Sequence, residues 1–215
     1  MNRRGLILAA ASAAAATRGA AQQSAAVPLG NTPPGQLPAG FRVALTGRGT
    51  APAWAVVDDA SVPAGRVLAQ TSTDQTDYRF PLAIYDGVTA KDVEVTVRFK
   101  AVAGRVDRAG GIAVRLIDAD NYYVLRANAL EDNVNFYHVV RGSRRQIRGV
   151  DTKVAPDQWH TLSLKAAGDQ FTIGFNDKTL FTVADRTFAN AGKVALWTKA
   201  DSVTRFDGLT IRTLS

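Results

Sequence analysis

QWHTLSLKAAGDQFTIGFNDKTLFTVADRTFANAGKVALWTKADSVTRFDGLTI, residues 158–211, is the stretch that decides the fold of this chain. Its apolar residues alternate with polar ones over short runs, and Gly, Asn and Asp residues separate the runs. In residues 170–176, for example, Phe171, Ile173 and Phe175 share one face. Such alternation between turn signals is typical of antiparallel strands. The stretch therefore predicts consecutive strands of a sandwich.

The same pattern extends toward the N-terminus. In residues 92–100, Val93, Val95 and Val97 occupy one face of a predicted strand and polar residues the other. Arg141 to Arg144 form a tight hairpin turn, and no convincing helical run separates the strands. The sequence therefore predicts an all-β sandwich or barrel. The fourteen expected strands are 41–45, 54–57, 66–70, 81–85, 92–100, 112–116, 122–128, 134–141, 146–150, 159–166, 170–176, 179–184, 193–198 and 203–212.

The N-terminal residues predict export. Arg3 and Arg4 precede an apolar, alanine-rich run that is too short for a good membrane span and suits a signal peptide. The paired arginines fit the twin-arginine route, and the Sec route stays open. We expect a signal peptide over 1–21, a flexible Pro/Gly-rich leader over 22–40 and one β-sandwich domain over 41–215. The mature chain would be periplasmic or secreted, with no integral membrane segment.

Composition narrows the possible chemistry. The chain has no cysteine, which excludes disulfides, thiolate metal sites and a cysteine nucleophile. Its two histidines limit imidazole chemistry. The formal charge of +7 falls to about +4 once the three arginines of the signal segment leave. This mild excess and the predicted export argue against nucleic acid as a partner.

Several motifs resemble one superfamily. Residues 115–126 (RLIDADNYYVLR), Trp159-His160, the hairpin at 175–178 and residues 192–197 (GKVALW) look like the motifs of concanavalin A-like, laminin-G-like sandwiches. Within that group the chain most resembles the bacterial 3-keto-disaccharide hydrolases. The resemblance covers about residues 92–211 and implies a jelly roll of two bent antiparallel sheets. It also implies carbohydrate on the concave face, although many such folds bind sugars without cutting them.

A catalytic constellation is missing from the sequence. Glycosidases place two carboxyl groups across the scissile bond, and this chain has only two glutamates, Glu94 and Glu131, neither in the expected pattern. Glu94, with Asp92 two residues away, is the nearest approximation to a catalytic pair. An exposed acidic strand residue beside Arg98 is the alternative interpretation.

The candidate ligand-binding residues are basic and aromatic. Alternation places Arg115 opposite the core stripe of its strand, and Trp197 and Lys199 opposite that of theirs. Tyr122 and Tyr123 point to opposite sides, so only one can join them. Aromatic rings stack on sugar C–H faces, and arginine or lysine donates to hydroxyls. We expect one ligand floor made of Arg115, Tyr123, Arg126, Tyr137, Trp197 and Lys199, with a solvated sheet face as the alternative.

The remaining polar residues have ordinary structural interpretations. We expect His160 and His138 to be buried or edge histidines rather than catalytic bases. Asp118, Asp120 and Asn121 have oxygen ligands for calcium, but an Asx turn is favoured and we expect no cofactor. The arginines at 141–148 suit either an anionic partner or a charged edge strand.

Three hypotheses follow for function. The first is an exported module that binds a glycan on its concave sheet face. The second is a glycoside hydrolase or lyase acting on 3-keto-disaccharides, with Glu94 and either Arg115 or Arg126 acting on the substrate. The third is an adhesion domain that uses the arginine hairpin.

Overall fold

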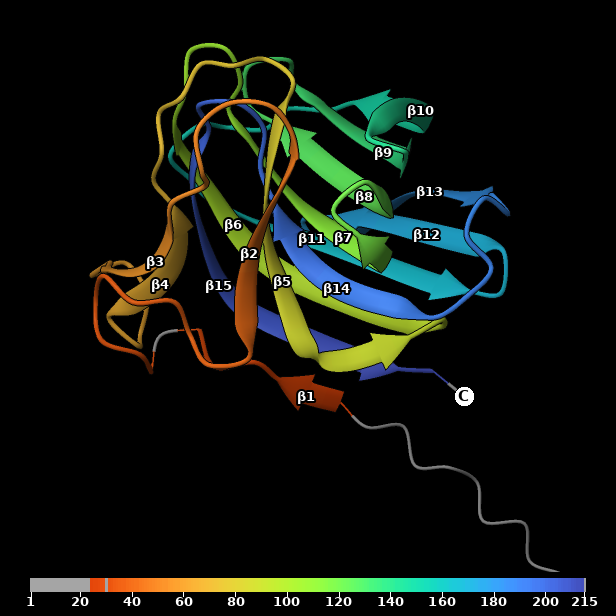
Figure 1. Ribbon diagram of the computed structural model, residues 1–215, viewed down its shortest axis with the longest axis horizontal. Coiled ribbons are helices and arrows are strands. Elements are labelled where there is room, and N and C mark those ends of the chain that lie inside the picture. The colour runs from red at the N-terminus through yellow and green to blue at the C-terminus, as the bar shows by residue number, and fades with distance from the viewer. Residues whose placement is uncertain (1–23, 30, 215) are drawn as a thin grey trace, which may run out of the picture.

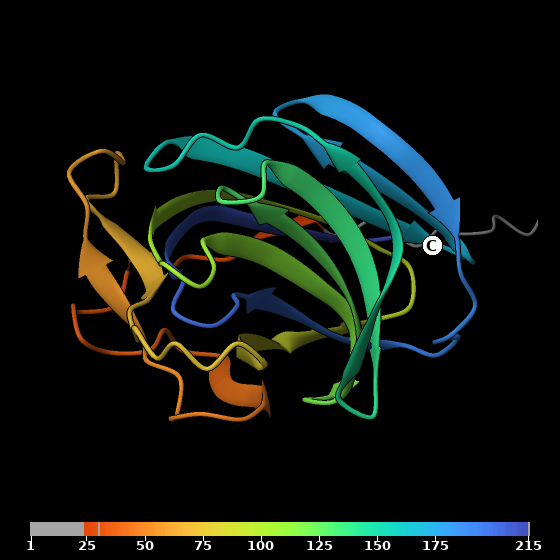
Figure 2. The ribbon, with the colours of Figure 1, turned by 90° about the horizontal axis from the view of Figure 1, so that it is seen from above.

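The computed structural model describes residues 24–29 and 31–214, which form two antiparallel β-sheets packed face to face (Figures 1 and 2). The predicted all-β sandwich is confirmed. Within these residues, no helix is long and apolar enough to cross a membrane. The predicted signal peptide, residues 1–21, lies outside the described part of the chain.

The first sheet has eight strands in the order β13-β12-β11-β6-β15-β4-β3, with β1 beside β15. The long strand β15 pairs with β6 along one side, and on the other side with β4 and then β1. The strands are β1 (Ser24–Ala26), β3 (Trp54–Asp58), β4 (Arg66–Gln70), β6 (Val93–Ala103), β11 (Trp159–Ala167), β12 (Gln170–Phe175), β13 (Lys178–Ala184) and β15 (Val203–Thr213).

The second sheet has seven strands in the order β10-β9-β8-β7-β14-β5-β2. The strands are β2 (Phe41–Gly47), β5 (Arg79–Ala90), β7 (Ala109–Asp118), β8 (Asn121–Asn128), β9 (Asn133–Val140), β10 (Ser143–Asp151) and β14 (Gly192–Trp197).

The main core lies between the sheets. Val95 and Phe99 of β6 meet Ile112 of β7 and Leu125 of β8 there, all without exposed surface. A second buried apolar cluster lies on the opposite face of the seven-stranded sheet and draws on that sheet alone. This sheet is therefore covered on both faces, whereas period-two alternation alone favours one wet face.

The structure corrects the prediction of a flexible leader over residues 22–40, because part of this segment packs on the sandwich. Ser24–Ala26 form β1 on β15, and Val27 and Leu29 enter the main core with 6% and 3% of their surface exposed. The backbone N–H of Gly35 donates to the carbonyl of Val56. The prolines that follow β1 favour irregular structure, and a three-residue strand has no alternation of its own, so its pairing with β15 depends on the fold.

A β-bulge on β7 overturns the expected alternation that places Arg115 opposite the core stripe of its strand. Arg115 has a φ of 48°, and the pairing of β7 with β8 shifts register between Val114 and Asp118. The bulge turns Leu116 toward the second cluster, whereas Ile112 and Val114 face the main core. Strict alternation therefore ends at Arg115, since one extra residue reverses the face of every residue after it.

Candidate functional site

The outer face of the seven-stranded sheet is strongly concave. Five strand spacings separate β10 from β5, roughly 24 Å in a flat sheet. The Arg144 guanidinium of β10 nevertheless lies 4.8 Å from the ring centre of Phe80 on β5. The Tyr78 hydroxyl donates to the Gly142 carbonyl at 2.7 Å and accepts from the Arg144 N–H at 2.8 Å. The sheet therefore curls until two of its corners meet across this face, which we call the concave face.

Aromatic side chains fill one half of the concave face. We define the aromatic cluster as Phe80, Tyr122, Tyr137 and Trp197, all buried. The Trp197 Nε1–H donates to the Tyr122 hydroxyl at 3.2 Å, and Arg144 lies over the rings of Phe80, Tyr137 and Trp197. Burial raises the pKa of Tyr122 far above its usual range. This half is a packed second core and offers no open floor.

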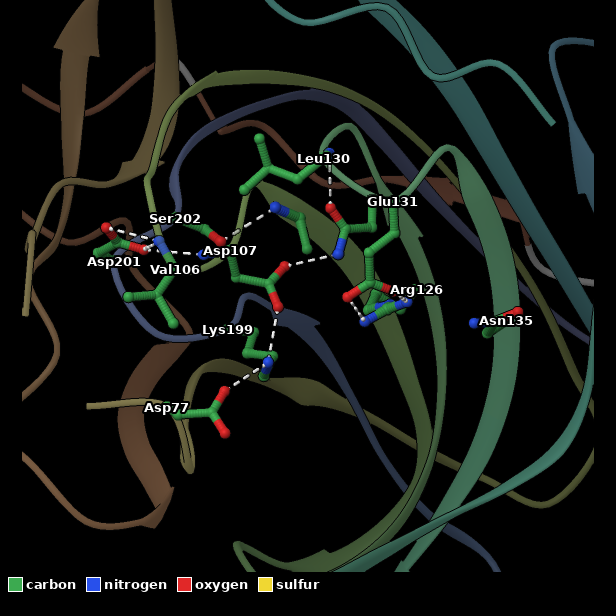
Figure 3. Close-up of polar contacts among 12 residues, drawn as sticks. Asp77, Val106, Asp107, Arg126, Leu130, Glu131, Asn135, Lys199, Asp201 and Ser202 are labelled. Carbon is green, nitrogen blue, oxygen red and sulfur yellow. Dashed lines mark hydrogen bonds and ion pairs between the residues drawn. The ribbon is translucent and has the colours of Figure 1, made fainter. Parts of the chain in front are cut away.

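The other half of the concave face carries charged and amide groups. Arg126 of β8 is buried, and its Nη2 donates to Glu131 Oε2 at 2.7 Å (Figure 3). The same Nη2 donates to Asn133 Oδ1, also at 2.7 Å. Asn133 Nδ2 donates to the same Glu131 oxygen at 3.0 Å. Burial raises the pKa of Glu131, but the bonds from Arg126 and Asn133 outweigh it and lower that pKa. Glu131 is thus a fixed, ionised acceptor.

Lys199 links a second part of the same site. Its Nζ lies 2.7 Å from an Asp77 carboxylate oxygen and 2.8 Å from an Asp107 oxygen (Figure 3). Burial lowers the pKa of Lys199, but the bonds to Asp107 and Asp77 outweigh it and raise that pKa. Asn128 Nδ2 donates to the buried Asp107 at 2.9 Å. We call the set Asp77, Asp107, Arg126, Asn128, Glu131, Asn133 and Lys199 the polar cluster.

A carboxylate fixes the loop that carries Asp107. Asp201 accepts the backbone N–H groups of Arg105, Val106 and Asp107 at 2.7–3.1 Å. Gly104 has a φ of 145°, and a Cβ there would lie 1.8 Å from the Asp107 carbonyl oxygen, so the turn requires glycine. The loop therefore holds Asp107 in place before any ligand arrives.

Four of the six predicted ligand residues meet on the concave face. Trp197 and Tyr137 belong to the aromatic cluster, and Arg126 and Lys199 to the polar cluster. Trp197 has no exposed surface and Tyr137 has 6%. Neither ring therefore forms an open stacking platform, and Tyr137 packs against Arg126, whose guanidinium lies 5.5 Å from its ring centre.

Arg115 and Tyr123 lie elsewhere, so the predicted single floor is wrong. Tyr123 points into the main core, where its ring stacks near Phe136, and its hydroxyl donates to Asp185 at 2.6 Å. Arg115 is directed by the bulge to the rim of the sandwich, with its guanidinium 5.0 Å from the ring centre of Phe171. Tyr122, rather than Tyr123, faces the concave side.

Glu94, the catalytic candidate, is far from the polar cluster. It lies on the outer face of the eight-stranded sheet, in register with Lys165 and Arg212, and forms an ion pair with Arg212. The sandwich separates it from Arg126, and Arg115 pairs with Asp92 instead, so the expected partnership of Glu94 with either arginine is not assembled. Glu94 is an acidic strand residue as the alternative interpretation expected, but it is half-buried and pairs with Arg212 instead of lying exposed beside Arg98.

The structural interpretations of His160 and of the Asx turn are confirmed, whereas His138 lies on the inner strand β9 and contacts the side chains of Thr187 and Asp185. His160 is buried, with Nε2 3.0 Å from the Ala155 carbonyl oxygen, and His138 is half-buried on β9. Asp118 Oδ1 accepts the Asp120 N–H at 2.8 Å, which is an Asx turn. Among the described residues, no group of three or more His, Cys, Asp or Glu side chains could hold a metal ion.

The arginine hairpin is an edge structure. β10 is the outermost strand of its sheet, and Arg141 and Gly142 both have positive φ, as a two-residue type I′ turn requires. Arg141, Arg145 and Arg148 are exposed along this edge. These charges oppose edge-to-edge pairing with another chain. Arg144 has the different role of closing the concave face.

Sequence reasoning missed the acidic and amide half of the site. Glu131 lies in the β8–β9 turn and Asn133 begins β9, whereas Asp77 and Asp107 lie in loops distant from them in sequence. One local signal existed, because Glu131 and Asn133 follow Arg126 within seven residues across a turn. The loop residues carried no such signal, since only the fold brings them to Lys199.

Comparison with known families identifies the class of domain. The model of the galactocerebrosidase C-terminal lectin domain family matches residues 87–214, more than half of the chain. The chain therefore belongs to this family of lectin domains. A search of curated proteins finds no significant match.

Solved structures share the jelly-roll fold. The carbohydrate-binding module CBM66 from Bacillus subtilis superposes with a TM-score of 0.64 at 21% identity, covering 81% of this chain and 96% of that one. A Bacillus subtilis protein of unknown function with a galectin-like fold gives 0.54 at 10% identity, covering 81% and 90%. A Bacteroides ovatus mixed-linkage glucan GH16 protein in complex with its product gives 0.51 at 13%, covering 73% and 84%. At these identities the likeness concerns the fold.

Proposed function

We propose that this domain binds carbohydrate on its concave face, at the polar cluster. Membership of a lectin-domain family supports the ligand class. The observation that carries the location is the Arg126–Glu131–Asn133 network, whose rigid, mutually bonded groups border solvent on a curved sheet. The Glu131 and Asp77 side chains are 46% and 73% exposed, beside the buried Arg126 and the half-buried Lys199.

The chemistry of the polar cluster suits sugar hydroxyls. An ionised carboxylate has about four lone-pair sites, so Glu131 can accept hydrogen bonds from sugar hydroxyl groups in addition to its bonds from Arg126 and Asn133. Asp77 and the Lys199 ammonium add an acceptor and a donor at the opposite side. Val106 and Leu130, with 39% and 47% of their surface exposed, offer apolar contacts for sugar C–H groups beside the cluster. Because these groups are already held in place, binding costs little ordering entropy.

A glycan array followed by calorimetry tests the location. Neutral and acidic glycans are screened, and each one bound is titrated into the wild type and the Glu131→Gln and Asp77→Asn variants. We expect Glu131→Gln to weaken binding at least tenfold, because it replaces an anionic acceptor with an amide. Asp132→Asn is the matched control, since Asp132 is the adjacent acid and pairs with Lys153 instead. Unchanged affinity in both Glu131→Gln and Asp77→Asn would refute the location.

A second candidate function is cleavage of 3-keto-disaccharides or related glycosides. The resemblance of residues 115–126 and 192–197 to such hydrolases supports it. This chemistry needs a base beside a cation, and Glu131 with Arg126 is such a pair at 2.7 Å. The measurement is turnover of a 3-keto-disaccharide and its parent sugar by the wild type, Glu131→Gln and Glu94→Gln. Turnover that Glu131→Gln alone abolishes supports cleavage, and its absence in all three leaves binding as the function.

We also propose that the domain is exported. The support is the basic start and apolar run within residues 1–21. Residues 1–40 fused to a reporter should carry it out of the cytoplasm of a bacterial host. Replacing Arg3 and Arg4 by lysine should stop export by the twin-arginine route and leave Sec export intact. A reporter that stays in the cytoplasm with the natural residues would refute export.

A further inference from the structure

A pocket of about 400 Å³ opens at the rim of the sandwich, apart from the polar cluster. Three chain segments form it: the β5–β6 turn with Lys91, the β11–β12 turn with Gly168 and Asp169, and residues 185–189 between β13 and β14. Arg115 also lines it. We call this the rim pocket.

Arg115 ties the three segments of the rim pocket together. Its Nε donates to the Lys91 carbonyl at 2.9 Å and its Nη1 to the Phe188 carbonyl at 2.8 Å. Its Nη2 donates to the Gly168 carbonyl and lies 3.3 Å from the Asp92 carboxylate. One buried guanidinium thus holds a backbone carbonyl from each wall. The pocket is therefore formed in advance of any ligand.

The remaining lining groups balance in charge. Arg186 pairs with Asp169 through Nε and Nη2, both at 2.8 Å, and this contact lowers the pKa of Asp169. Burial raises the pKa of Asp185, but hydrogen bonds from Thr187 and Tyr123 outweigh it and lower that pKa. Both carboxylates are ionised, and they are matched by Lys91 and Arg186. The third cation of the lining, Arg115, is matched by Asp92, which lies 3.3 Å from its Nη2. A net anion or cation would therefore find no excess of opposite charge in the rim pocket.

The lining also matches the two sides of a sugar ring. Phe188 gives a mostly buried aromatic wall, while Asp169 and Asp185 accept hydrogen bonds and Arg186 and Lys91 donate them. A neutral polyol needs this combination of acceptors, donors and an apolar surface. The volume lies at the small end of ligand sites, which span about 300–1,000 Å³. It suits one terminal ring better than the interior of a long chain.

We propose that the rim pocket is a second saccharide site, which takes a single neutral terminal sugar ring. The ligand class rests on the proposed function, whereas the site itself rests on the geometry above. Arg115 lies four residues beyond Gly111, the β7 partner of Arg126, which is roughly 13 Å along the strand, and its side chain points away from the concave face. The two sites are therefore independent and give the domain two points of attachment to a glycan.

Residue-resolved NMR of the whole chain distinguishes the two sites. ¹⁵N-labelled protein is titrated with D-glucose, D-galactose, D-mannose, D-fructose and, as an anionic probe, sodium sulfate. We expect at least one sugar to shift the amide signals of Gly168, Arg186 and Ala189 saturably. We expect sulfate to leave them in place.

Variants then assign the response. Asp169→Asn and Arg186→Ala should weaken the rim response at least tenfold and leave the signals of Glu131 and Asn133 responsive as before. Asp177→Asn is the matched control, since Asp177 is an exposed acid in the next turn and asparagine tolerates its φ of 61°. Arg115 is not substituted, because its loss would disrupt all three walls.

Each outcome decides between the two proposals. Saturable shifts at the rim support the second site, whether or not the polar cluster responds. A response at the polar cluster alone overturns the rim site and keeps the proposed function. No response at either place overturns both, and a stronger rim response to sulfate than to any sugar overturns the neutral ligand class.

Discussion

Tyr122 and Tyr123 are adjacent in sequence and serve opposite faces of β8. Tyr122 joins the aromatic cluster of the concave face, and its hydroxyl bonds to Thr46 and Trp197. Tyr123 lies in the main core, donates to Asp185 and accepts the Phe188 N–H at 3.0 Å. One residue pair therefore stabilises the aromatic half of the concave face and a wall of the rim pocket.

Tyr123 makes the free energy of unfolding fall at alkaline pH. Burial, followed by its bond to Asp185, raises the pKa of Tyr123 to about 12. A raised pKa favours the neutral form in the folded state, so this stabilisation is complete below pH 10 and is lost as the pH rises toward 12. From pH 8 to 11 the wild type should lose roughly 1.4 kcal/mol through this group. Tyr123→Phe should lack that part of the loss.

Urea unfolding of both proteins at several pH values measures the effect. Tyr123→Phe should be less stable at pH 8, because Phe188 N–H and Asp185 lose a partner, at a cost of about 1–3 kcal/mol. The gap should narrow as the pH rises to 11. A gap that stays constant over this range would contradict the assignment.

At the scale of elements, short strands at the edges complete the sandwich. β1 covers the second half of β15 where β4 ends, and it delivers Val27 and Leu29 to the core. The β7 bulge delivers Arg115 to the rim in a comparable way. Both features fix side chains that regular strands would leave elsewhere.

Leu29→Ala tests the contribution of this N-terminal segment. Leu29 is 3% exposed, so its truncation should lower the free energy of unfolding by about 2–4 kcal/mol. Ala26→Ser, at an exposed position of β1, is the control and should change little. Denaturant unfolding gives both values. Equal stability of Leu29→Ala and the wild type would mean that the segment does not pack in solution.

At the scale of the molecule, the curl of the seven-stranded sheet decides what can bind. It brings Arg144 of β10 onto rings from β5, β9 and β14, which closes half of the concave face and leaves the polar cluster at the other half. No cysteine strengthens this closure, so side-chain packing must hold it.

Arg144→Ala should loosen the curl. Loss of three ring contacts should lower the free energy of unfolding by about 2 kcal/mol, with little dependence on salt because the contacts are screened from solvent. Arg145→Ala is the matched control, since Arg145 is the exposed neighbour on the same strand. Urea unfolding at low and high NaCl measures both variants. Equal effects of the two substitutions would show that Arg144 does not close the sheet.

Prediction from sequence succeeded where the signal was local. The alternation in residues 93–99 gave the buried face of β6, and Arg141-Gly142 gave the hairpin turn. Of the candidate site, Arg126, Tyr137 and Trp197 were placed on one face, since each follows the period of its own strand, and Lys199 joins that face two residues after β14 ends. Arg115 failed because a single bulge residue reverses that period.

The sequence by itself determined the all-β class, the strands and their inward faces, because neighbouring residues on a strand must point to opposite sides. Only the tertiary structure decided which outward row stays open. Sheet curvature brings Arg144 onto Phe80, and the fold brings Asp77 and Asp107 to Lys199. Those contacts join residues far apart in the chain, and no local pattern encodes the bend that creates them.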